Sequence, residues 1–104
     1  MPIVLMEFSI FPVDRGGSLS PYVAKALDVV DRSGLPYRLG PMGTTIEGEY
    51  DACMAVARDC FEAMAKDCDR VLLQLRVDYR RDRRGAIDSK TASVERELGR
   101  KLRT

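Results

Sequence analysis

The chain has 104 residues, the usual length of one domain, and its 45% hydrophobic and 32% charged residues are typical of a soluble globular protein rather than a disordered one. Histidine is absent, which excludes His-ligated zinc sites and Ser-His or Cys-His nucleophile pairs. The net charge of +1 hides an asymmetry, because residues 76–104 carry ten Lys/Arg against five Asp/Glu, so this end is expected to attract an anion or an acidic face of another copy.

The chain begins with an expected strand at residues 3–12, in which Val4, Met6, Phe8 and Ile10 share one side. Its first residues lack the basic segment of a signal peptide, and no run reaches the ~18 apolar residues of a membrane span. We therefore expect a cytoplasmic protein with no membrane partner.

Two helices and three more strands are expected next, followed by a third helix. Each is bounded by proline, glycine or charged residues. The expected ranges are 20–32 (helix), 37–42 and 43–48 (a tight pair of strands), 49–66 (helix), 70–79 (strand) and 88–102 (helix).

This order, βαββαβ with an additional C-terminal helix, predicts an α+β fold of the ferredoxin-like sandwich type, in one domain that spans residues 1–104. Two helices would cover one face of the sheet. The opposite face, which we call the open face, is mixed, with Leu5 and Leu72 beside Glu7, Glu47 and Arg76. Because a monomer rarely exposes a large apolar patch, we expect the open face to join copies into a homo-oligomer, a dimer or tetramer.

The last helix supports this expectation. Its apolar stripe is narrow, and consists of Val94, Leu98 and Leu102. A stripe of this width is typical of a helix that packs on a neighbour or on a sheet edge.

The three cysteines, Cys53, Cys60 and Cys68, follow one another at spacings of seven and eight, which places them on one helical face. This pattern is typical of small buried side chains in a reducing compartment. A metal site would need closer pairs with further ligands, so we expect neither a metal nor a cofactor.

The most informative segment is Pro41-Met42-Gly43-Thr44-Thr45-Ile46-Glu47-Gly48. It combines three polar side chains with two glycines, which tolerate backbone angles or close approaches that other residues do not. Strand alternation puts Thr44 and Ile46 on one face, and Thr45 and Glu47 on the other.

Several segments, in this order, resemble the thiamine-binding protein family (the MTH1187/YkoF-like group, UPF0045). They are Met6-Glu7-Phe8-Ser9-Ile10-Phe11-Pro12, Ser33-Gly34-Leu35-Pro36-Tyr37, the segment 41–48 and Lys90-Thr91-Ala92-Ser93-Val94. The resemblance implies a ferredoxin-like fold, assembly through sheets into dimers or a homotetramer, and binding of thiamine or its hydroxymethylpyrimidine part. It implies no catalysis and therefore no catalytic residue.

The resemblance also implies a set of ligand contacts. Glu47 would accept a hydrogen bond from the amino group of an aminopyrimidine, and Thr44 or Thr45, together with Ser9, would supply hydroxyls. Phe11, Met42 or Tyr37 would cover the flat ring, and Asp78 would face the positively charged thiazolium.

Some alternatives stay open at this point. Thr44 points toward the helices by simple alternation, so either the ligand lies between sheet and helix or a bulge at Gly43 shifts the facing. Glu47 and Arg76 would form an ion pair across an oligomer interface if the open face were only an interface.

Other classes of protein are also open. They are a structural or regulatory oligomer without a ligand, an RNA-binding module that uses the basic residues 80–84, and an enzyme with Glu7 and Glu47 as an acid/base pair. The RNA-binding reading is disfavoured because the third strand lacks aromatic residues, so no nucleic-acid partner is expected.

Overall fold

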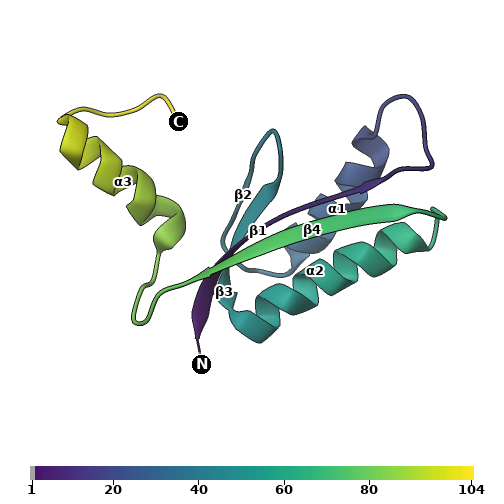
Figure 1. Cartoon of the computed structure of the whole chain (residues 1–104), viewed down its shortest axis with the longest axis horizontal. Helices are drawn as coiled ribbons and strands as arrows, with labels where there is room; N and C mark the ends of the chain where they lie inside the picture. The colour runs from purple at the N-terminus through teal and green to yellow at the C-terminus, as the bar shows by residue number, and fades with distance from the viewer. Residues whose placement is uncertain (1) are drawn as a thin grey trace.

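A computed structural model describes residues 2–104 of the chain (Figure 1). Its elements follow the predicted order: β1 (Ile3–Pro12), α1 (Ser20–Arg32), β2 (Tyr37–Leu39), β3 (Thr44–Glu49), α2 (Tyr50–Ala65), β4 (Val71–Tyr79) and α3 (Ala86–Leu98). None of the helices in these residues is long and apolar enough to cross a membrane.

The four strands form one sheet in the order β2-β3-β1-β4, and every neighbouring pair is antiparallel. Helices α1 and α2 lie side by side and cover one face of this sheet (Figure 1). The predicted ferredoxin-like fold is therefore confirmed.

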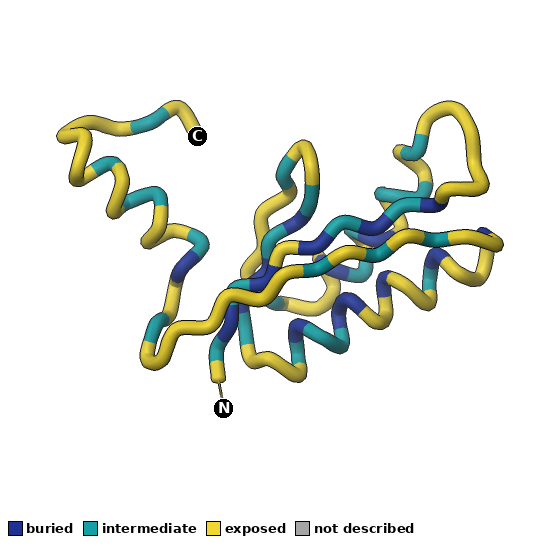
Figure 2. Tube along the Cα trace, in the orientation of Figure 1, coloured by how far each residue is buried: buried dark blue, intermediate teal, exposed yellow. Residues whose placement is uncertain are grey.

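The core lies between the sheet and these two helices, where the buried residues gather (Figure 2). The alternation of side chains along β1 explains this position of the core, since every second side chain from Val4 to Ile10 is buried. The three cysteines are free and buried in the same layer. Burial raises the pKa of the Cys53 thiol to about 11, and it raises that of Cys60 to about 11 as well.

Two elements differ from their expected bounds by more than one residue. β2 ends at Leu39, three residues early, because the chain turns at Gly40, whose N–H donates to the Gly43 carbonyl at 2.8 Å. α3 runs from Ala86 to Leu98 instead of 88–102. It is bounded by Gly85 and Gly99, which both adopt the left-handed conformation that favours glycine.

α3 projects from the body of the molecule instead of packing along it (Figure 1). The extents of 47 × 33 × 20 Å and the radius of gyration of 15.2 Å reflect this, since a compact chain of this length has a radius of about 13 Å. Val94 and Leu98 are half-exposed on α3, at 50% and 51%.

Candidate functional site

The open face of the sheet carries charged side chains that are paired within the chain. The register places Glu7 of β1 between Thr45 of β3 and Arg76 of β4. The Arg76 guanidinium donates to the Glu7 carboxylate at 2.6 Å. Among the described residues, Arg76 therefore pairs with Glu7 and not with Glu47.

Glu47 lies on the same face but is buried, with 7% of its surface exposed. Its carboxylate accepts hydrogen bonds from the backbone N–H groups of Ala86 at 2.8 Å and Ile87 at 3.3 Å. These N–H groups belong to the first turn of α3, which has no partner for them within the helix. Glu47 thus fastens the beginning of α3 to β3, and its negative charge matches the positive end of the helix dipole.

A second contact fastens α3 to the neighbouring strand. Arg38 of β2 donates to the Asp88 carboxylate at 3.0 Å and to the Ile87 carbonyl at 3.4 Å. Both β3 and β2 therefore hold the beginning of α3, whereas its distal half projects.

Asp78 is surrounded by cations. Lys90 of α3 donates to its carboxylate at 2.9 Å, and Arg83 donates to it at 3.0 Å. The hydrogen bond from Lys90, and then that from Arg83, lowers the pKa of Asp78. Asp78 borders a depression of about 390 Å³ on the open face, together with Thr45, Glu7 and Arg76.

A more apolar hollow lies at the opposite end of the sheet. β3 begins at Thr44, opposite Phe8, so β1 beyond Phe8 has no partner strand on that side. The turn 40–43 and α1 enclose the space that results, which measures about 430 Å³. Its lining is mostly apolar with a few polar groups and includes Phe8, Ser9, Phe11, Val23, Leu27, Leu39, Met42, Thr44 and Gln74.

Thr44 faces the helix side of the sheet, where it is 4% exposed. The pairing of β1 with β3 runs without interruption from Ile3–Glu49 to Phe8–Thr44, so no bulge at Gly43 turns it to the open face. Gly43 instead permits a close approach, since a Cβ there would lie 3.0 Å from the Phe8 carbonyl oxygen. Thr44 therefore points toward the helices, as simple alternation along the strand predicts.

The eight residues predicted as ligand contacts fall into separate groups. Four border the hollow: Ser9, Phe11, Met42 and Thr44. Thr45 and Asp78 border the open-face depression, and Glu47 is covered by α3. The Tyr37 hydroxyl donates to the Asp31 carboxylate at 2.9 Å, and this bond raises the Tyr37 pKa.

Sequence reasoning did not single out Gln74 or Leu27 as lining residues of the hollow. The register of β4 with β1 puts Gln74 beside Ser9, and the helical spacing in α1 puts Leu27 on its sheet-facing side. The sequence does not show that β2 ends at Leu39 and that β3 begins only at Thr44, which together open the hollow.

Comparison with known proteins identifies the family. A model of the family described as thiamine-binding protein matches residues 6–95. A UPF0045 protein of Mycobacterium bovis is 39% identical over 96 residues, which cover 91% of this chain and 94% of that protein. The fold superposes on the UPF0045 protein of Methanocaldococcus jannaschii with a TM-score of 0.84 and 33% identity, covering 90% of this chain and 97% of the other.

A Thermotoga maritima protein, for which a role in thiamine biosynthesis or salvage has been proposed, superposes with a TM-score of 0.79 and 26% identity over 89% of this chain and 99% of its own. The family match spans most of the chain and agrees with the segments that suggested it. The chain belongs to the thiamine-binding protein family.

Proposed function

We propose that this protein binds thiamine or a related hydroxymethylpyrimidine compound, without catalysis, in the hollow between α1 and the turn 40–43. The observation that carries the proposal is that the hollow is bordered by segment 41–48, one of the segments that resemble the family, through Met42, Gly43 and Thr44. Its volume of about 430 Å³ falls within the range of about 300–1,000 Å³ usual for small-molecule sites.

The side chains of the hollow suit an aminopyrimidine. Thr44 and Ser9 carry hydroxyls that donate and accept, and the Gln74 amide does both as well, which matches an amino group beside ring nitrogens. Because Thr44 is almost fully buried, a hydrogen bond there is shielded from water.

The remaining walls suit a flat ring. Phe11 and Leu27 offer apolar surface, and Met42 stands at the rim with 90% of its surface exposed. A flexible thioether side chain packs well on an aromatic face, so Met42 would lie over a bound ring. We expect Met42 to become protected from solvent when the ligand binds.

The proposal includes a homo-oligomer that forms through the open face. Leu5 and Leu72 leave apolar surface there, and α3 presents Val94 and Leu98 to solvent. A second copy of the chain would cover the apolar part of the open face and these two side chains of α3. Glu47 would then act through the position of α3, and Thr45 and Asp78 would lie near the interface and not near the ring.

Calorimetric titration with thiamine and with hydroxymethylpyrimidine tests the proposal. Thr44→Val keeps the shape of the side chain and removes its hydroxyl, and we expect about a tenfold or greater loss of affinity, since a buried partner left without its hydrogen bond costs about 1–3 kcal/mol. Thr45→Val, one residue away on the other face, is the matched control and is expected to bind as the parent protein does.

Two results would contradict the proposal. Equal losses in both variants would move the site away from the hollow. An absence of heat with either ligand, from a protein that light scattering shows to be a folded oligomer, would favour a structural oligomer without a ligand.

A further inference from the structure

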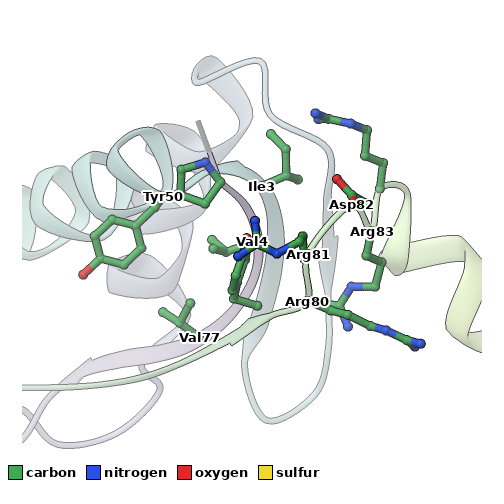
Figure 3. A pocket seen from close by; sticks show the side chains of 11 residues that line it. Ile3, Val4, Tyr50, Val77, Arg80, Arg81, Asp82 and Arg83 are labelled. Carbon is green, nitrogen blue, oxygen red and sulfur yellow. The ribbon is translucent and has the colours of Figure 1, made fainter.

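A second cavity, of about 510 Å³, lies at the start of β1, beside the loop that joins β4 to α3 (Figure 3). One part of its lining is apolar and aromatic, and includes Ile3, Val4, Val77 and Tyr50. The other part is the loop itself, which contributes four arginines and one aspartate: Arg80, Arg81, Asp82, Arg83 and Arg84.

This loop has a defined shape. The Arg83 N–H donates to the Arg80 carbonyl at 3.1 Å and closes a turn. The Arg83 guanidinium donates to both the side chain and the carbonyl of Asp78, each at 3.0 Å, and its side chain is only 18% exposed. Arg83 is therefore an anchor that holds the loop to β4.

The other three arginines of the loop do not anchor it to β4. Within residues 2–104, no carboxylate lies within ion-pair distance of Arg80, Arg81 or Arg84, whereas Arg38, Arg76 and Lys90 all have carboxylate partners. Arg80, Arg81 and Arg84 lie within five residues and have Asp82 as the single carboxylate among them, so this part of the loop keeps a net positive charge that a bound anion would reduce.

The two sides of the cavity differ in charge. In the view of Figure 3, Arg81 and Tyr50 lie on opposite sides of Val4. Two acidic residues flank Tyr50 in the sequence, Glu49 and Asp51. Both are exposed, and neither lines the cavity. An occupant would therefore place its anionic end against the loop and its apolar part against Tyr50.

We propose that this cavity binds a small molecule that carries a phosphate or diphosphate group. Guanidinium groups present planar pairs of N–H donors that match phosphate oxygens, and they remain charged at any physiological pH. The site is separate from the hollow, since Ile3 and Ser9 are six residues apart on one strand, a span of about 20 Å. One ligand of thiamine size does not fill both within a chain.

Calorimetric titration with inorganic pyrophosphate tests this site. The double variant Arg81→Gln/Arg84→Gln removes two free guanidinium groups and leaves the Arg83 anchor in place. We expect saturable binding by the parent protein and a loss of roughly tenfold or more for each arginine removed. The matched control is Arg58→Gln/Arg100→Gln, which changes the net charge equally at exposed positions away from the cavity and is expected to keep the affinity.

Added thiamine separates this site from the proposed function. Pyrophosphate affinity that stays the same with saturating thiamine supports two independent sites, and pyrophosphate binding without any thiamine binding still supports this one. No saturable binding of pyrophosphate, or an equal loss in the control variant, would overturn the proposal. Binding of a single-stranded oligonucleotide with no binding of pyrophosphate would also overturn it, and would assign the loop to nucleic acid.

Discussion

At the residue scale, Glu47 has the most consequential position in the chain. The sequence leaves two roles open for this carboxylate, a ligand contact and an ion pair with Arg76 across an interface, and in the structure it holds the first turn of α3. Its partners are backbone N–H groups 39 and 40 residues further along the chain, which no sequence pattern reports. The role toward a ligand stays a prediction, whereas the contact with α3 is a structural observation.

Replacing Glu47 by alanine is therefore expected to loosen α3. The Ala86 and Ile87 N–H groups would lose their acceptor, at a cost of about 1–2 kcal/mol, typical for a helix N-terminal cap. Hydrogen exchange at these two amides should then be roughly 5–30 times faster. Glu49→Ala, at the exposed end of β3, should leave both rates unchanged; if Glu47→Ala does too, the capping role is wrong.

The buried thiols give a second prediction at this scale. Because burial raises the pKa of Cys53 and of Cys60 to about 11, both remain protonated at pH 8 and react very slowly with thiol reagents in the folded state. Unfolding restores their ordinary value of about 9. The stability from these thiols is therefore full below pH 9 and is lost as the pH rises toward 11.

Labelling at pH 8 with and without urea measures this behaviour. The rate should follow the unfolded fraction for both cysteines. Rapid labelling of either one in the native protein would show that it is reached by solvent and is not a core side chain.

At the scale of elements, β1 and the first helix could be predicted to the residue, because the alternation of period two and the Gly34-Leu35-Pro36 stop are written in local sequence. The ends of β2 and α3 could not. β2 stops where the turn at Gly40 closes, and α3 stops at Gly99, before Leu102, which sequence periodicity had included. The hollow results from the end of β2 and the turn that follows it, so the sequence predicts its residues individually and not as a group.

The projecting half of α3 leads to a prediction about assembly. Leu98→Lys places a charge in the stripe that is proposed to contact a second copy, so the oligomer should dissociate, as measured by size-exclusion chromatography with light scattering. Glu97 is exposed on the same helix, outside the stripe. Glu97→Lys raises the net charge of the chain by more than Leu98→Lys does, yet the oligomer should persist in this control variant. A monomer in both, or an oligomer in both, would contradict the role of the stripe.

At the scale of the whole molecule, ligand binding must raise stability, because a ligand that binds only the folded chain shifts the unfolding equilibrium. At a thiamine concentration of 100 times the dissociation constant, the gain is about 2.7 kcal/mol. For a chain of this size that corresponds to an increase in Tm of roughly 10–20 °C. Thr44→Val at the same thiamine concentration should lose most of the increase, and an undiminished shift would contradict the site.

The central claim is that thiamine occupies the hollow beside the turn 40–43, and amide NMR of the isotope-labelled protein during a thiamine titration tests it most directly. We expect the largest shifts at Gly40, Gly43 and Thr44 and along residues 9–11, with little change at Ala86 and Ile87. Shifts that gather around Glu47, Asp78 and the beginning of α3 would instead place the ligand on the open face, and unchanged spectra would contradict thiamine binding altogether.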